Sequence, residues 1–310
     1  MADPVQQDEL LRTIRQVMSR EKESSGVVSG EWLEPSAPTV HRAPPTTHHS
    51  PLTTHLTVLV AEDNEFNAEL LEQLLGRRGH RVRVARNGRE ALVLTEIGAF
   101  DLLLLDIHMP ELDGFQVVRA VRERERTTGG HLPVIALTAR SRQEDREQCL
   151  AAGMDEFLAK PIQAADLWTK IEALLSSQQP QGQPKSPADQ PKAGLLDPRA
   201  LLAACGGDEV VLKNICRAFT AGAPAHLTSI ESALDGGDAP LLREAAHKIC
   251  GMIAAFSTEA GQVASNLEDE AAAGRLESCR PLVEQLVSLT RQLLPQLNGL
   301  SIEALRGGSR

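Results

Sequence analysis

The sequence predicts an α/β domain with a doubly wound parallel sheet, followed by an all-α, antiparallel four-helix bundle. Residues 56–175 alternate short β-type runs with helical patterns in five β-α units, which is typical of a parallel sheet with helices on both faces. Residues 195–298 carry helical spacing and no strand pattern. Residues 176–194 are rich in Pro and Gln and are expected to form a linker between the two domains.

In the first domain, each expected strand is a short apolar run that is followed by a turn and an amphipathic segment. The expected strands are 57–61, 81–85, 102–106, 134–138 and 156–158. The expected helices are 67–78, 88–96, 113–126, 142–152 and 163–175.

In the second domain, glycine pairs and one proline divide the helical pattern. Asp208 and Asp238 each follow a glycine pair and are suitable N-caps. Pro224 is expected to separate two helices. The expected helices are 198–204, 209–221, 224–234, 239–256, 258–273 and 276–297, and residues 299–310 are expected to be a tail.

The N-terminal 55 residues are expected to lie outside both domains. Residues 1–20 have the spacing of an amphipathic helix and resemble residues 160–171, so they are a possible remnant of an earlier copy of the α/β domain; chance similarity remains an equal alternative. Residues 21–55 are rich in Ser, Pro, Thr and His and are expected to be a disordered linker. Metal binding by its histidines is conceivable but less favoured than a solvated linker.

Composition argues against several classes of protein. The net charge of −10 and the absence of tyrosine disfavour nucleic-acid binding and base stacking. No apolar run approaches the roughly 18 residues of a membrane span, and we expect neither a membrane association nor a signal peptide. Five cysteines without a C-x-x-C pair indicate reduced thiols, so a cytoplasmic location is expected.

Polar residues stand at the carboxyl ends of four expected strands, where parallel sheets place their sites. Glu62 and Asp63 follow the first, Asp106 ends the third, Thr138 ends the fourth and Lys160 follows the fifth. Acids at strand ends are often only turn formers, but the complete set suits a magnesium-assisted phosphoryl transfer to aspartate. Asp106 would be the nucleophile, the acidic pair would hold the ion, and the hydroxyl and ammonium groups would hold phosphoryl oxygens.

The same region strongly resembles the receiver domains of two-component response regulators, through the runs VLVAEDN, LLLLDIHMPELDG, VIALTA and FLAKPI. The resemblance implies a (βα)5 fold and phosphorylation of Asp106. It implies Mg²⁺ ligands at Glu62, Asp63, Asp106 and the backbone carbonyl of His108. It implies switching through Thr138 and Phe157, and a cis peptide at Lys160-Pro161. The His108 side chain either tunes hydrolysis or is merely exposed, and the second interpretation is favoured.

His247 is the candidate phosphoacceptor of the second domain. Leu242, Ile249 and Ile253 share an apolar helix face, so His247 is predicted to point to solvent. Gly251, one turn later, leaves space where a partner domain carrying a phospho-aspartate could approach. An imidazole is a competent nucleophile near neutral pH.

The second domain resembles the histidine phosphotransfer (HPt) family through the runs LLDPRALL, GGDEVVL, LLREAAHKICGM and AAFST. The resemblance implies phosphorylation of His247. Where that family usually has lysine, three residues after the histidine, this chain has Cys250, and lysine stands at Lys248 instead. Ser257 replaces a frequent glycine. These departures put the transfer rate in doubt. The candidate phosphotransfer surface comprises Arg243, Lys248, Cys250 and Gly251.

The sequence therefore predicts a phosphorelay carrier that receives a phosphoryl group from a histidine kinase and delivers it through His247 to a downstream response regulator. No ATP-binding kinase motif is present, so the chain is not expected to be a kinase, although it could be part of a larger hybrid kinase. A haloacid-dehalogenase-type hydrolase is disfavoured because His108 stands where that family needs a second aspartate. A non-catalytic docking scaffold remains the alternative.

Overall fold

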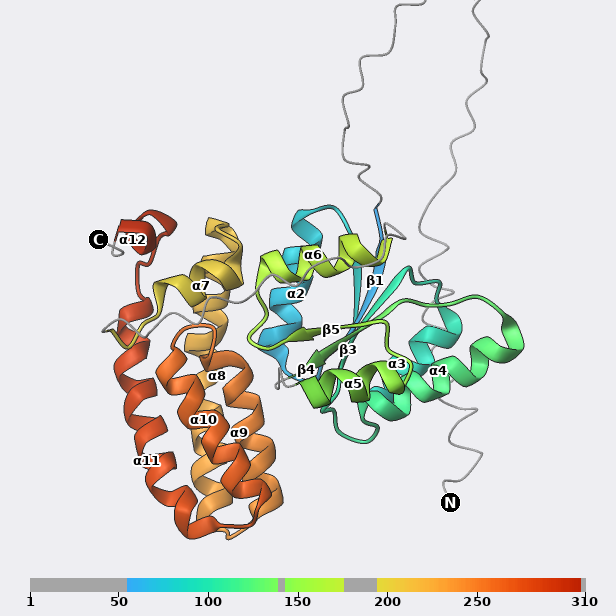
Figure 1. Ribbon diagram of the computed structural model, residues 1–310. Coiled ribbons are helices and arrows are strands. Elements are labelled where there is room, and N and C mark those ends of the chain that lie inside the picture. The colour runs from blue at the N-terminus through green and yellow to red at the C-terminus, as the bar shows by residue number, and fades with distance from the viewer. Residues whose placement is uncertain (1–54, 139–142, 176–193, 308–310) are drawn as a thin grey trace, which may run out of the picture. The chain divides into compact units, whose positions relative to one another are not determined.

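The computed structural model describes residues 55–138, 143–175 and 194–307, all of which fall in one compact unit, Thr53–Arg310 (Figure 1). The predicted N-terminal helix at 1–20, nearly all of the linker at 21–55 and most of the linker at 176–194 lie outside the described residues. Within the described residues, no helix combines the length and apolar composition needed to cross a membrane.

The first domain contains a five-stranded parallel sheet in the order β2-β1-β3-β4-β5. The strands are β1 (Thr57–Ala61), β2 (Arg81–Ala85), β3 (Leu102–Asp106), β4 (Val134–Thr138) and β5 (Glu156–Ala159). The predicted strands are thus confirmed to within one residue. The strand order reverses between β1 and β3, and this switch point at the carboxyl ends of the strands is where open α/β sheets bind ligands.

Helices cover both faces of the sheet. They are α2 (Glu65–Arg77), α3 (Gly88–Ile97), α4 (Gly114–Thr128), α5 (Gln143–Ala151) and α6 (Ala164–Leu175). Buried residues of α2 and α6 pack on one face of the sheet, and those of α3, α4 and α5 pack on the other. Because both faces are covered, β3 and β4 are buried throughout and read as continuous apolar runs.

The second domain is helical (Figure 1). Its helices are α7 (Pro198–Cys205), α8 (Glu209–Asp235), α9 (Ala239–Ile253), α10 (Thr258–Ala272), α11 (Leu276–Leu293), the 3-10 turn η1 (Leu294–Leu297) and α12 (Ile302–Gly307). Helix α9 packs between α8 and α10, and α11 packs against both α10 and α8, so the four long helices close a bundle. Asp208 and Asp238 cap α8 and α9 as predicted.

Two predictions about the second domain were wrong. Helix α8 continues through Pro224, because Phe219, Ala223 and Leu227 lie buried on one face and their packing outweighs the lost backbone hydrogen bond. The expected tail at 299–310 contains α12, whose Ile302 is buried and donates its backbone N–H to Glu209 at 2.9 Å.

The α2 face of the sheet and the helical bundle share one apolar cluster. Phe66 at the start of α2 lies 5.8 Å, centroid to centroid, from Phe256, which in turn packs on Phe219 of α8. The first residues of α2 therefore support both the sheet and the contact with the bundle.

Candidate functional site

Three carboxylates meet at the switch point of the sheet. Glu62 and Asp63 follow β1, and Asp106 ends the neighbouring strand β3. One carboxylate oxygen of each lies within 4.8 Å of the others. Glu62 and Asp106 are fully buried. The structure thus brings together the three acids that the sequence predicts to act together.

Lys160 supplies the positive charge at this cluster. It follows β5 and precedes a cis peptide bond to Pro161, as predicted. Its Nζ lies 2.7 Å from Asp106 Oδ2 and 3.0 Å from Glu62 Oε1. Burial alone would lower the pKa of Lys160, but the two carboxylates outweigh that effect and raise it. Lys160 is therefore held as a cation, already paired with the predicted phosphoacceptor.

The cluster contains three carboxylates and one buried ammonium group, that of Lys160, so the carboxylates repel one another. Burial first, and then repulsion by Asp106, raise the pKa of both Glu62 and Asp63 above the ordinary range. Within the described residues, Glu62 Oε2 and Asp63 Oδ1 are buried without a hydrogen bond; Glu62 Oε2 lies 2.8 Å from Lys160 Nζ but outside hydrogen-bond geometry. Oxygen atoms left in this way suit a hard divalent cation, so the donor set fits Mg²⁺.

The predicted switch residues lie beside this cluster. Thr138 is buried at the end of β4, and its carbonyl accepts the backbone N–H of Lys160 at 2.7 Å. Phe157 is half-buried on β5, with Lys170 Nζ 5.0 Å and the Arg146 guanidinium 5.5 Å from its ring centroid. Their positions suit the predicted roles, which remain predictions.

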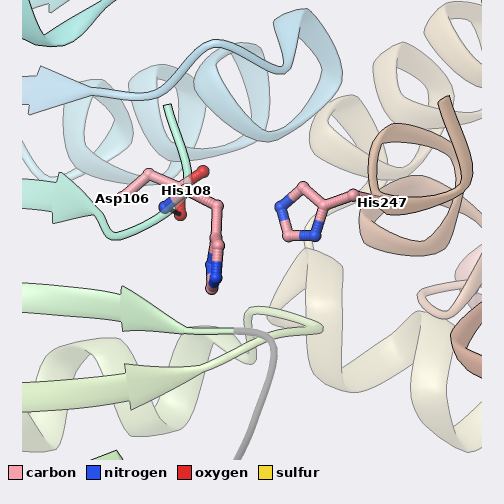
Figure 2. A group of neighbouring side chains, drawn as sticks. All are labelled: Asp106, His108 and His247. Carbon is pink, nitrogen blue, oxygen red and sulfur yellow. Dashed lines mark hydrogen bonds between the residues drawn. The ribbon is translucent and has the colours of Figure 1, made fainter. Parts of the chain in front are cut away.

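His247 projects from α9 toward the carboxyl end of β3 (Figure 2). One ligand atom of its ring lies within 4.8 Å of a carboxylate oxygen of Asp106 and a ring nitrogen of His108, and the two imidazole centroids are 5.2 Å apart. The prediction that His247 points to solvent was wrong. The residue does lie off the apolar face of α9, but its side chain is only 13% exposed because the loop after β3 covers it.

Glu268, on α10, is a functional candidate that the sequence analysis missed. Its Oε1 lies 3.2 Å from His247 Nδ1. Burial would lower the pKa of His247, but the hydrogen bond and charge of Glu268 outweigh it and raise that pKa. Burial likewise would raise the pKa of Glu268, and His247 lowers it. The missed signal is that Glu268 is the acid of the run 268–270 that falls among the buried residues Ala264, Leu267 and Ala271.

His108 lies next to His247. Its pKa is lowered, first by partial burial of its ring and second by the charge of His247. His108 is exposed, in line with the favoured prediction, and its ring also lies beside the site, with its centroid 5.2 Å from that of His247 (Figure 2).

The candidate phosphotransfer surface faces the first domain. Lys248 Nζ lies 3.5 Å from Asp63 Oδ2 and 2.8 Å from Glu244 Oε1. Arg243 lines a cavity of about 300 Å³ together with His108, His247 and Glu268. The lysine therefore reaches the acidic cluster from its shifted position on the helix.

Gly251 of α9 packs closely against Asn67 of α2. A Cβ at this position would lie 2.9 Å from Asn67 Nδ2. The space that the sequence analysis noted above this glycine is therefore filled by the chain's own first domain.

Cys250 lies beside the site, but its thiol is expected to be unreactive. It lines a small cavity with Lys160, Pro161 and His247, and its Sγ contacts the Gly261 carbonyl at 3.7 Å. Burial raises the pKa of Cys250 to about 12, so the thiol is protonated near neutral pH. Cys250 is therefore not expected to act as a reactive thiol.

Further polar contacts join the two domains. Asn64 caps α2 and donates its Nδ2 to the Lys248 carbonyl at 2.7 Å, and Arg77 Nε donates to Asp208 Oδ2 at 2.7 Å. Sequence reasoning missed both, because contacts between residues more than 100 positions apart leave no local pattern.

Comparisons with known proteins find two protein families along the chain. Residues 58–172 match the response regulator receiver domain family, and residues 214–299 match the Hpt domain family. The chain is 40% identical over 119 residues to hybrid signal transduction histidine kinase B of Dictyostelium discoideum, covering 36% of this chain and 6% of that protein. It is 38% identical over 131 residues to response regulator MprA of Mycobacterium sp. (strain KMS), covering 42% of this chain and 55% of that protein.

Among solved structures, the receiver domain of sensor histidine kinase PA1611 from Pseudomonas aeruginosa is 37% identical, with a TM-score of 0.37; the match covers 40% of this chain and 100% of that one. The chain thus spans less than two thirds of both curated relatives and all of this receiver domain. The chain belongs to the two-component phosphorelay proteins, with a response regulator receiver domain and an Hpt domain on one polypeptide.

Proposed function

We propose that the chain is a phosphoryl carrier that accepts a phosphoryl group on Asp106 and exchanges it with His247 of the same chain. The observation that supports this is the approach of the two acceptors, whose ligand atoms lie within 4.8 Å (Figure 2). Each acceptor has its own counter-ion, Lys160 at Asp106 and Glu268 at His247.

The contact of His247 Nδ1 with Glu268 favours Nε2 as the nucleophilic atom. A proton on Nδ1, donated to the carboxylate, leaves the lone pair on Nε2. In transfer, the Nε2–P bond forms as the P–O bond to Asp106 breaks, and the released carboxylate returns to Lys160. The ring keeps its Nδ1 proton and gains positive charge, which Glu268 stabilises. This transfer consumes no ATP, so the phosphoryl group can pass in either direction between Asp106 and His247.

Glu62, Asp63, Asp106 and the His108 backbone carbonyl would hold Mg²⁺. When bound, the ion neutralises charge on the carboxylates and on the phosphoryl oxygens. Thr138 would donate its hydroxyl to a phosphoryl oxygen, and Phe157 would report phosphorylation by changing its packing. Lys248 lies near enough to the acidic cluster to steady the transferring group, with Arg243 beside it at the cavity.

The partners follow from the chemistry of a carrier. A histidine kinase would supply the phosphoryl group, and the receiver of a downstream response regulator would take it from His247. The proposed domains are the receiver at 56–175 and the phosphotransfer domain at 195–298. A place within a larger hybrid kinase system is part of the proposal, and so is the cytoplasm, where a kinase has ATP. The docking-scaffold alternative is weaker, because a scaffold needs no buried lysine paired with Asp106.

The test is a labelling experiment with an isotopically labelled small acyl phosphate and Mg²⁺. Acid and alkali lability separate aspartyl phosphate from phosphohistidine in wild type, Asp106→Asn and His247→Gln. His131→Gln, a change at an exposed histidine outside the site, is the matched control. We expect alkali-stable label in wild type and the control, and none in either acceptor variant.

Mixing the two acceptor variants separates transfer within one chain from transfer between chains. In the mixture, label reaches His247 only between molecules, so its rate should be far lower than in wild type and should rise with concentration. Wild-type label that never leaves Asp106 would refute the carrier function for this bundle. Equal rates in the mixture and in wild type would refute transfer within one chain.

A further inference from the structure

Three metal-ligating side chains meet where the receiver approaches the Hpt domain. Asp106 ends β3, His108 lies two residues further along the loop, and His247 comes from α9 (Figure 2). Each offers one ligand atom, and the three atoms lie within 4.8 Å of one another. This set shares only Asp106 with the acidic cluster of Glu62 and Asp63.

The donor types of this set differ from those of a magnesium site. Two imidazoles and one carboxylate suit borderline ions such as Zn²⁺, whereas Mg²⁺ takes oxygen ligands. Three protein ligands with an open fourth position are a common zinc arrangement. We therefore expect Mg²⁺ to prefer the set with Glu62 and Asp63 and a zinc-class ion to prefer the set with His108 and His247.

Neighbouring groups already orient two of the three ligands, His247 and Asp106. Glu268 Oε1 lies 3.2 Å from His247 Nδ1, which leaves Nε2 as the free ligand atom. A carboxylate that holds the second nitrogen of a histidine is the usual support for a metal-ligating imidazole. Asp106 is fixed by Lys160 Nζ at 2.7 Å and by the His108 backbone N–H at 3.2 Å.

A cavity gives access to two of the three ligands, His108 and His247, whereas Asp106 is fully buried. The cavity of about 300 Å³ is lined by His108, His247 and Glu268, and also by Asp63 and Arg243. Both acidic and basic side chains line this cavity, so its overall charge neither repels a cation nor strongly attracts one. The ligand atoms at its wall, rather than the general field, would decide the affinity.

We propose that Asp106, His108 and His247 form a binding site for a zinc-class transition ion that joins the two domains. A bound ion would occupy the reacting atoms of both Asp106 and His247. Metal binding and phosphoryl transfer would therefore exclude each other. This consequence rests on the proposed function, but the binding itself does not.

The test is a zinc titration of the full chain in excess Mg²⁺, read by competition with a chromophoric chelator, and a parallel Co²⁺ titration read by its visible spectrum. His108→Ala and His247→Gln should each lose more than about 100-fold in affinity, since changes behind the ligands alone cost about 10–100-fold. Glu268→Gln should fall within that lower range. His131→Gln should bind as wild type does, and thermal melts would check that each variant is folded.

The result that overturns the proposal is zinc affinity, and a cobalt spectrum, that stay at wild-type values in both His108→Ala and His247→Gln. The ion would then be held elsewhere, for example by the histidines at 41, 48 and 49. Zinc binding that depends on His108 in a chain that shows no relay would support the metal site and refute the proposed function, so the two failures are distinguishable.

Discussion

Gly251→Ala should slow phosphoryl transfer while stabilising the bundle that carries it. The added Cβ would lie 2.9 Å from Asn67 Nδ2, closer than such contacts normally occur. Asn67 is 3% exposed and its Nδ2 donates to Glu62 Oε1 at 3.2 Å, so this side chain cannot move without losing a hydrogen bond. If Asn67 stays in place, α2 must instead move away from α9. The hydrogen bond from Asn64 Nδ2 to the Lys248 carbonyl, which is 2.7 Å long, is then lost.

The magnitude follows from these two hydrogen bonds. Each is worth about 1 kcal/mol and one of them is lost on either route, so the docked arrangement should weaken by about 1 kcal/mol. Since about 1.4 kcal/mol corresponds to a factor of ten, the equilibrium constant for docking should fall about 5-fold. Alanine in place of glycine inside a helix favours the helix by about 1 kcal/mol, so the melting temperature of the bundle should not fall.

The assay is the single-turnover rate of label movement from Asp106 to His247, with a thermal melt of each variant. Gly222→Ala is the matched control, because the same change within α8 would meet no atom closer than 3.8 Å. It should show the same gain in helix stability with an unchanged transfer rate. Equal transfer rates in the two alanine variants would refute the reasoning that α9 and α2 must meet at this glycine.

Three further predictions concern single side chains. Lys160→Met leaves the buried Asp106 carboxylate without its partner and should lower the free energy of unfolding by about 3–5 kcal/mol, measured in urea with a chelator present. Added Mg²⁺ should restore part of this loss. An unchanged urea midpoint in chelator would contradict the prediction. Burial would raise the pKa of Glu125, but the Leu132 N–H and Arg122 outweigh it and lower that pKa. Its stabilisation is therefore complete above its ordinary pKa of 4.5 and is lost as the pH falls through the lower folded value, so Glu125→Gln should flatten acid unfolding curves. Cys250, with a pKa of about 12, should be alkylated at pH 8 roughly 1,000-fold more slowly than a free thiol, and urea should abolish the difference.

The parts of the site that the sequence predicts are those encoded by local pattern. Asp106 follows four leucines, and a fully buried parallel strand requires such a run, so its position at the end of β3 could be predicted. The switch point then brings Asp106 beside Glu62 and Asp63 without further information. Lys160 is placed by the strand before it in the same way.

What the sequence analysis missed depends on packing between distant residues. Pro224 breaks an isolated helix, yet α8 continues because tertiary contacts stabilise both sides of it. His247 lies off the apolar face of its own helix, so helical periodicity predicts exposure; only the approach of the receiver buries it. Glu268 becomes part of the site through a hydrogen bond to another helix, which no spacing within α10 specifies.

The same arrangement that favours transfer within the chain opposes transfer to a partner. His247 is only 13% exposed, and α2 fills the space above Gly251, so a downstream receiver cannot reach the histidine while the chain's own receiver is docked. The docked contacts combine an apolar cluster shared by the two domains, which includes Phe66 and Phe256, with polar contacts such as Asn64 to the Lys248 carbonyl. Delivery to a partner therefore requires the receiver to leave first, and variants that loosen docking, such as Gly251→Ala, should slow loading of His247 while they speed its unloading to an added receiver.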